Sequence, residues 1–89
     1  MLQLPTTLTQ SQAQECLEAL TVGVQREPDS QVVVDAAALH SFDSSALAVL
    51  LALRRECARV GKRFAVRGLS ERLLALATLY GIEGLLPSA

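Results

Sequence analysis

The sequence predicts a small α/β layer in which three to four mostly parallel strands accompany three helices. Short apolar or β-branched runs alternate along the chain with longer segments of helical periodicity, and strands joined by helical crossovers form a parallel sheet. The 89 residues suffice for one small domain, and they contain no repeat or linker. Hydrophobic residues make up 51%, which is too many for a disordered chain. We therefore expect a single domain over residues 1–89.

The amino-terminal part predicts a weak strand and a helix. Leu2–Leu4 is the strand, and Pro5 limits it to an edge or a terminus. Apolar residues at helical spacing follow, and Pro28 ends that helix. The candidate N-caps are Thr9 and Ser11, with Gln12 or Gln14 completing a capping box. The apolar stripe consists of Ala13, Cys16, Leu17, Leu20 and Val24.

The central part predicts a buried strand and a long helix. The run Gln31–Val34 is β-branched and does not alternate, which indicates a strand covered on both faces. A polar loop over residues 35–42 leads into a helix that begins near Asp43 or Ser44 and runs to Val60. Gly61 lies just beyond its end, where glycine commonly terminates helices.

The carboxyl-terminal part predicts one more strand and one more helix. Phe64–Val66 is the strand, and Ser70 caps the helix that follows. Leu69 and Leu74 have the spacing of a hydrophobic staple. The Leu85-Leu86 pair is a candidate addition to the edge of the sheet. The stripe of this helix consists of Leu73, Leu76, Ala77 and Tyr80, with Gly81 at its end.

Composition disfavours several classes of function. Aromatic residues are only 3%, so stacking platforms for single-stranded nucleic acid are not expected. The net charge is −1, and it divides into −5 over residues 1–53 and +4 over residues 54–89, a dipolar pattern that does not indicate DNA binding. The longest apolar run, Ala46–Leu53, is too short to span a membrane. Residues 1–10 do not resemble a secretion signal, so we expect a cytoplasmic protein.

The two cysteines do not indicate a metal site. Cys16 and Cys57 are far apart in sequence, and the chain has a single histidine, whereas a zinc site needs about four closely spaced ligands. We interpret both as small buried thiols, with a redox pair as the alternative. We expect neither a metal nor a cofactor.

The loop before the central helix is the candidate functional site, because open parallel sheets bind partners at the carboxyl ends of their strands. It holds the densest polar cluster of the chain: His40, Ser41, Asp43, Ser44 and Ser45. A catalytic triad would need such groups to converge from separate elements, and a phosphate-binding loop would need glycines that are missing here. We therefore expect no catalytic residue. Simple helix capping by Asp43 or Ser44 remains a further interpretation.

Two features of the central helix are open to more than one interpretation. Ala46–Leu53 is apolar on all sides, which indicates either a protein-docking face or merely alanines that favour helix. Basic residues then crowd its end and either complement the helix dipole or face an anionic lipid or an acidic partner. These basic residues are Arg54, Arg55, Arg59, Lys62 and Arg63.

The sequence resembles the STAS domain family, the fold of anti-sigma factor antagonists. The resemblance covers residues 31–86 and depends on the strand Val32–Val34 followed by Asp35, and on the step Phe42-Asp43-Ser44-Ser45-Ala46-Leu47 before the long helix. This step is similar to the D-S-[ST]-G-L motif of the family, although Ala46 replaces the usual glycine. The segments at 67–70 and 76–87 resemble the MlaB branch. The resemblance therefore implies a STAS-like layer.

The resemblance to the MlaB branch implies a non-enzymatic cytoplasmic subunit of a phospholipid-transporting ABC complex that maintains outer-membrane asymmetry. Its partner would be the ATPase subunit (MlaF-like), within a complex that also holds permease and lipid-binding subunits at the inner membrane. No nucleic acid and no membrane span of its own are expected. The expected partner-binding residues are Ser41, Phe42, Asp43, Ser44, Ser45, Leu47 and Ala48.

The alternative that the resemblance leaves open is an anti-sigma factor antagonist. Ser45 occupies the position at which these antagonists carry their phosphorylated serine. A phosphate there would lie near the positive end of a helix but would add about −2 charge beside Asp43. The missing glycine at position 46 and the Leu79-Tyr80-Gly81-Ile82 segment favour the transport role.

Overall fold

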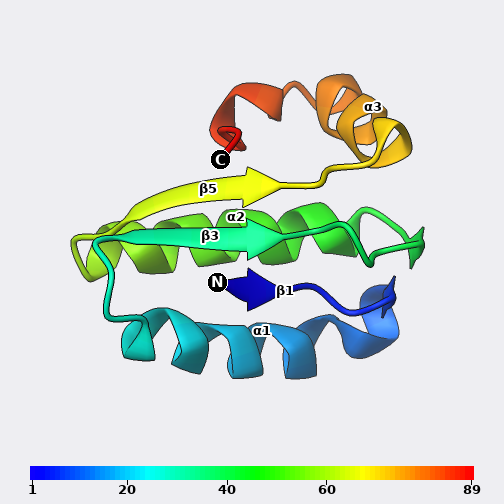
Figure 1. The fold of residues 1–89 in the computed structure, drawn as a ribbon. Helices are drawn as coiled ribbons and strands as arrows, with labels where there is room; N and C mark the ends of the chain where they lie inside the picture. The colour runs from blue at the N-terminus through cyan, green and yellow to red at the C-terminus, as the bar shows by residue number, and fades with distance from the viewer.

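The computed structural model describes all 89 residues, Met1–Ala89. Its main sheet has three strands in the order β1-β3-β5, and both pairings are parallel (Figure 1). The prediction of a small, mostly parallel α/β layer with three helices is confirmed. The elements are β1 (Leu2–Gln3), β2 (Thr7–Leu8), α1 (Gln10–Arg26), β3 (Gln31–Asp35), β4 (Ser41–Phe42), α2 (Ser45–Arg59), β5 (Arg63–Arg67), α3 (Glu71–Leu79) and a 3₁₀ turn, η1 (Glu83–Leu85).

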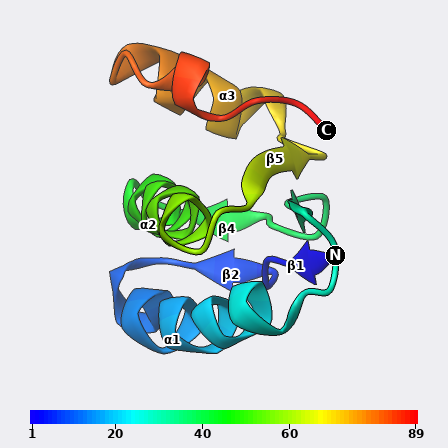
Figure 2. The ribbon, with the colours of Figure 1, turned by 90° about the vertical axis from the view of Figure 1, so that its left-hand side faces the viewer.

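Strand β3 is the centre of the sheet, and it is covered on one face only. Val32 and Val34 are fully buried, whereas Val33 is half-buried and Gln31 is exposed. The three helices all lie to one side of the sheet, as Figure 2 shows. The prediction of a strand buried on both faces is therefore wrong. The consecutive valines reflect the β-branched preference of strands and do not indicate a second covering layer.

A second, two-stranded parallel sheet was not predicted. Thr7 of β2 pairs with Ser41 of β4, and Leu8 pairs with Phe42. The carbonyl oxygen of Thr6 also accepts hydrogen bonds from the backbone N–H groups of His40 and Ser41. The segment that leads into α2 is thereby tied to the segment that leads into α1, so the starts of the two helices lie side by side.

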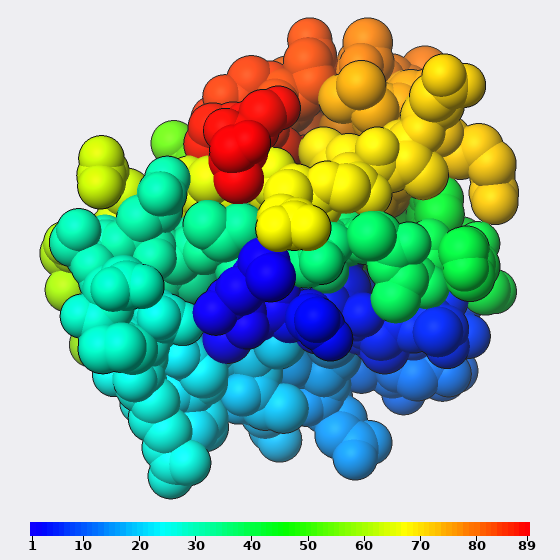
Figure 3. Space-filling view, viewed as in Figure 1, coloured from blue at the N-terminus to red at the C-terminus, as the bar shows by residue number.

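The carboxyl-terminal tail closes part of the sheet edge, but not through Leu85-Leu86 as expected. Leu85 belongs to η1, and Leu86 is buried in the core. Ser88 instead forms an isolated parallel bridge with Val66. The N–H of Val66 donates to Pro87 O (2.8 Å), and the N–H of Ala89 donates to Val66 O (3.0 Å). Figure 3 shows the red tail lying against the yellow β5 segment.

The predicted starts of all three helices are confirmed, and Thr9 and Ser70 are the N-caps of α1 and α3. For α1, Thr9 is the N-cap, and Gln12 Oε1 accepts from both the backbone N–H (2.9 Å) and the hydroxyl (2.6 Å) of Thr9. For α3, Ser70 Oγ accepts from the N–H of Leu73 (3.1 Å). Each bond satisfies a polar group at a helix start.

The core consists almost entirely of aliphatic side chains, but the α3 stripe extends less far than predicted. Leu73 and Ala77 are buried, whereas Tyr80 is 58% exposed and Leu74 is 45% exposed. Tyr80 directly follows α3 and its N–H still donates to Leu76 O, but its side chain lies at the surface and not in the core. The predicted staple is only partly packed, because Leu74 is largely at the surface. The predicted α1 stripe faces the core, with Val24 fully buried.

Both cysteines are free thiols, with Cys57 buried and Cys16 half-buried. Burial raises the pKa of each thiol. A thiol that stays protonated is a poor nucleophile. The two side chains therefore act as small apolar packing groups.

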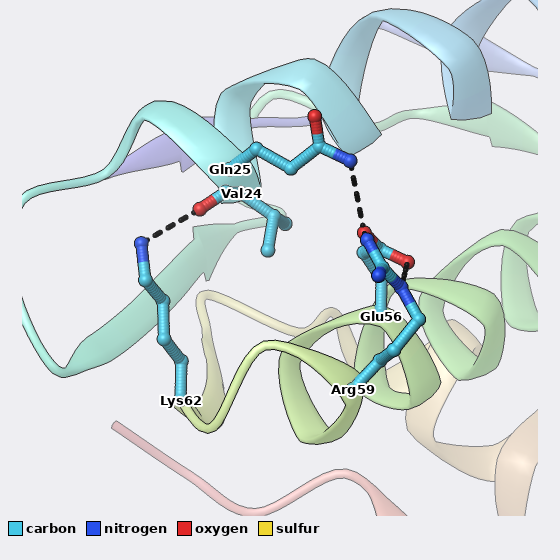
Figure 4. Close-up of polar contacts among 5 residues, drawn as sticks. All are labelled: Val24, Gln25, Glu56, Arg59 and Lys62. Carbon is cyan, nitrogen blue, oxygen red and sulfur yellow. Dashed lines mark hydrogen bonds and ion pairs between the residues drawn. The ribbon is translucent and has the colours of Figure 1, made fainter.

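The ends of α1 and α2 are joined by polar contacts (Figure 4). Lys62 Nζ donates to Val24 O (2.8 Å) and to Glu27 O, which satisfies carbonyl groups that the end of α1 leaves without helical partners. Glu56 accepts from Gln25 Nε2 (3.1 Å) and forms an ion pair with Arg59 (2.5 Å). The hydrogen bond from Arg59, followed by that from Gln25, lowers the pKa of Glu56 to about 2. Part of the basic cluster thus has a structural role.

Candidate functional site

The candidate site lies where β4 passes into α2. Asp43 accepts a hydrogen bond from the N–H of Ser45 through Oδ1 (2.8 Å) and one from the N–H of Gln10 through Oδ2 (3.2 Å). Ser45 and Gln10 are the first residues of α2 and α1. One carboxylate therefore satisfies donors at two helix starts, where negative charge is also favoured by the helix dipoles. These hydrogen bonds, that from Ser45 first, lower the pKa of Asp43.

Ser44 has no capping task. It directly precedes α2, but its backbone is already helical (φ −62°, ψ −16°) and its side chain makes no capping hydrogen bond. Asp43 caps the helix instead, by accepting from the N–H two residues on, that of Ser45. Ser44 is exposed, and its hydroxyl forms no hydrogen bond within the chain. Between the two capping interpretations, the structure thus selects Asp43. The Ser44 hydroxyl is left free for an external group.

A shallow apolar groove runs from this point along α2 and α3. Its first part encloses about 620 Å³ and its second part about 340 Å³, and Ser44 and Tyr80 line both. The exposed side chains of Leu79 (79%) and Tyr80 (58%) stand along it. We call this feature the α2–α3 groove. Its lining consists of Phe42, Asp43, Ser44, Leu47, Ala48, Leu51, Arg72, Ala75, Leu76, Leu79, Tyr80 and Ile82.

Arg72 fixes the start of α3 against the loop. Its guanidinium carbon lies 4.9 Å from the centre of the Phe42 ring, a cation–π contact. Arg72 Nη1 also donates a long hydrogen bond to His40 O (3.4 Å). Residues 40–42 and α3 are far apart in sequence, and these contacts join them into one wall of the groove.

The structure brings the expected partner-binding residues together, but not all of them are accessible. Ser41, Asp43, Ser44 and Ala48 are exposed, and Phe42 and Ser45 are half-buried. Leu47 is only 3% exposed and belongs to the core. Leu47 therefore shapes the floor of the groove and offers almost no surface to a partner, contrary to its expected place in the docking surface.

The spare apolar surface expected on α2 is small. Within Ala46–Leu53, only Ala48 is exposed, while Leu51 and Ala52 are half-buried. The other positions are buried because α2 packs against both α1 and β5. Most of the exposed apolar surface of the groove comes instead from α3, through Leu79 and Tyr80. Sequence reasoning assigned Tyr80 to the core and did not single out Arg72.

The polar cluster does not have the geometry of a catalytic triad. Both Asp43 oxygens bind backbone N–H groups, and His40 forms its contact with Arg72 through its carbonyl oxygen and not through its imidazole. No group of three His, Cys, Asp or Glu side chains lies close enough to hold a metal ion. None of the helices combines the length and the apolar character that a bilayer-spanning helix needs. What the geometry offers is an apolar groove with a free hydroxyl at its end.

Comparison with known proteins identifies a family. A family model described as "Mlab, STAS domain" matches residues 1–87. The match covers nearly the whole chain and includes both walls of the α2–α3 groove. No curated protein sequence matches the chain.

Proposed function

The chain belongs to the STAS domain family and resembles MlaB, and we propose that it is a non-enzymatic subunit that binds and supports the ATPase of a phospholipid-transporting ABC complex. In this proposal the complex maintains outer-membrane lipid asymmetry, and the chain lies on the cytoplasmic side of the inner membrane. The ATPase subunit, of the MlaF type, contacts the α2–α3 groove. The permease and the lipid-binding subunits belong to the same complex.

The observation that carries the proposal is the free Ser44 hydroxyl at the end of an apolar groove. An interface needs apolar surface that loses water on binding and a few polar groups that fix the register. Leu79 and Tyr80 supply the first, and both are more than half exposed. Ser44 supplies the second, because Asp43 has taken over the capping of α2.

Such a subunit acts by binding alone. A protein that contacts one conformation of the ATPase more favourably than another shifts the ATPase toward that conformation. The rigid placement of the groove serves this purpose, because a preformed surface loses little entropy when it binds. Asp43 and Arg72 provide that placement through their contacts with Gln10, Ser45, Phe42 and His40.

Co-purification with the co-expressed ATPase tests the proposal. Ser44→Arg and Ala48→Glu place charged side chains at exposed positions of the groove, and we expect each to abolish co-purification while leaving the circular dichroism spectrum and the melting temperature close to wild type. Ser11→Arg and Ala19→Glu are matched controls, since both positions are exposed and lie on α1. We expect these two variants to bind normally. Normal binding by both groove variants would place the interface elsewhere.

A phosphorylation assay separates this function from that of an anti-sigma factor antagonist. Ser45 is half-buried, and its backbone N–H is held by Asp43. A phosphate on Ser45 would bring its charge close to that carboxylate, which is unfavourable. We expect mass spectrometry to find no phosphate on Ser44 or Ser45 after incubation with a cognate kinase. Stoichiometric phosphorylation of Ser45 would favour the signalling role.

A further inference from the structure

A second pocket lies at the opposite end of α2 from the α2–α3 groove. It encloses about 410 Å³ between the end of α2, the start of β5 and the carboxyl-terminal tail. We call it the β5-edge pocket. Its lining consists of Gln31, Arg54, Ala58, Lys62, Arg63, Phe64, Ala65, Pro87 and Ser88, and it includes no acidic residue.

The charges of this pocket are not neutralised within the chain. Arg54 and Arg63 are exposed and form neither an ion pair nor a side-chain hydrogen bond. Other arginines do have partners, as Arg59 has Glu56 and Arg67 has Asp35. Lys62 adds a third positive charge, although its ammonium group binds the end of α1. The pocket therefore carries positive charge that no acidic side chain of the protein neutralises.

A backbone donor points into the same pocket. The N–H of Arg63 donates inward to Ser30 O, whereas the N–H of Val66 donates outward to Pro87 O. Because backbone groups alternate in direction along a strand, the N–H of Phe64 points outward like that of Val66. The tail pairs with Val66 but not with Phe64. Phe64, which lines the pocket together with Arg54 and Arg63, thus has an unpaired backbone N–H at this strand edge.

We propose that the β5-edge pocket binds a phosphate group. Two guanidinium groups from different elements and one backbone N–H together match the several oxygens of a phosphate, which arginine binds through paired hydrogen bonds. The space accommodates a phosphate ester. The group can be a soluble phosphate ester or the headgroup of an anionic lipid, since both present the same oxygens. Ser44 and Arg54 are about 15 Å apart along the helix axis, so this proposal does not depend on the docking role of the groove.

Titration with inorganic phosphate at low ionic strength, followed by ¹H–¹⁵N NMR, tests the proposal. We expect a saturable shift of the Phe64 amide that sodium chloride at equal ionic strength does not reproduce. Arg54→Ala and Arg63→Ala should each weaken phosphate binding about fivefold, as expected for the loss of one partly exposed charge contact. Arg55→Ala is the matched control, because it removes the same charge from the neighbouring, exposed position of α2. It should leave the affinity unchanged.

Two further arms identify the source of the phosphate. If glycerol 3-phosphate gives a saturable shift of the Phe64 amide and the protein does not sediment with phosphatidylglycerol vesicles, the pocket binds a soluble ester. If the protein sediments with the vesicles, and Arg54→Ala abolishes this sedimentation while Arg55→Ala preserves it, the pocket binds a lipid headgroup. The proposal is overturned if neither probe gives a saturable shift. In that case Arg63 serves only to protect the edge of the sheet from pairing with another strand. The proposal is overturned as well if Arg55→Ala weakens binding as much as Arg54→Ala, or if an acidic peptide binds more tightly than phosphate.

Discussion

The carboxylate of Asp43 bridges the N–H of Gln10, 33 residues earlier in the chain, to the N–H of Ser45. Through this side chain the first turns of α1 and α2 share one acceptor. The same arrangement releases Ser44 from capping and fixes the end of the α2–α3 groove. Asp43 is one of the expected partner-binding residues, and its hydrogen bonds add a role in positioning the groove.

Asp43→Ala should destabilise the fold more than Ser70→Ala does. Ser70→Ala removes a single capping bond and should cost about 1 kcal/mol, while Asp43→Ala leaves donors unsatisfied at two helix starts. Urea denaturation of both variants measures the difference. Asp29→Ala, at an exposed position that forms no hydrogen bond, is the control. Equal midpoints for Asp43→Ala and wild type would show that the bridge contributes nothing.

Stability should fall in acid through Glu56 and Asp43. The pKa of Glu56 is lowered to about 2 and that of Asp43 is also lowered. A carboxylate whose pKa is lower in the folded state contributes stability above its unfolded pKa of about 4 and loses it as the pH falls toward the folded value. The melting temperature should therefore decline from about pH 4.5 to pH 2. Solvent screening keeps the effect small, because Asp43 is exposed and Glu56 is only half-buried.

The contribution of Glu56 is measured by comparing variants over this range. In Glu56→Gln the group that titrates is absent, so its melting temperature should change less between pH 4.5 and pH 2 than that of wild type. Glu15→Gln, which removes an exposed carboxylate without a hydrogen-bond partner, should follow the wild-type curve. If the melting temperatures of Glu56→Gln and wild type changed with pH in the same way, the ion pair of Glu56 with Arg59 would contribute nothing to the stability.

Lys62→Met should destabilise the protein by about 1–2 kcal/mol. The substitution keeps an unbranched apolar stem but removes the ammonium group that binds Val24 O and Glu27 O, together with its favourable interaction with the negative end of α1. Chemical denaturation followed by circular dichroism provides the measurement. Arg55→Met removes a charge that has no partner, and we expect its stability to stay within about 0.5 kcal/mol of wild type.

Gly68→Ala should be more damaging than Gly61→Ala. Both glycines have left-handed backbone angles, with φ of +72° and +74°, so alanine costs about 1–2 kcal/mol at either position. A Cβ at Gly68 would lie 2.9 Å from the backbone nitrogen of Ala37, whereas a Cβ at Gly61 would meet nothing within 4 Å. Thermal denaturation of the two variants should give a clearly lower melting temperature for Gly68→Ala. Equal melting temperatures would show that the loop at Ala37 can move to accommodate the added Cβ without loss of stability.

Periodicity in the sequence was sufficient to predict the helices and the parallel arrangement of the main strands. Thr9 and Ser70 were correct as caps because capping depends on the chemistry of one or two local residues. The β2–β4 pair was missed, since two-residue strands show no period. The single covered face of the sheet was missed because a run of valines looks the same whether one face or both are covered.

The residues predicted for the candidate site all lie in β4, in α2 or between them, and none of them lies on α3. The motif at residues 42–45 is contiguous, so its placement at the start of a helix follows from local signals. The contact of Arg72 with Phe42 joins segments 30 residues apart, and no local pattern indicates it. Tyr80 has the spacing of the α3 stripe, but the spacing does not show which end of the stripe other elements cover. Long-range packing thus determines which apolar residues face the core and which face the groove.

The placement of all three helices on one side of the sheet has a consequence for monitoring assembly. Gln31 on β3 and Gln3 on β1 are exposed, and the helices lie on the other side (Figure 2). A fluorophore attached to a cysteine introduced at Gln31 would sit away from the α2–α3 groove. Its rotational diffusion would slow when a larger protein binds, so fluorescence anisotropy could follow complex formation in real time without the dye obstructing the contact.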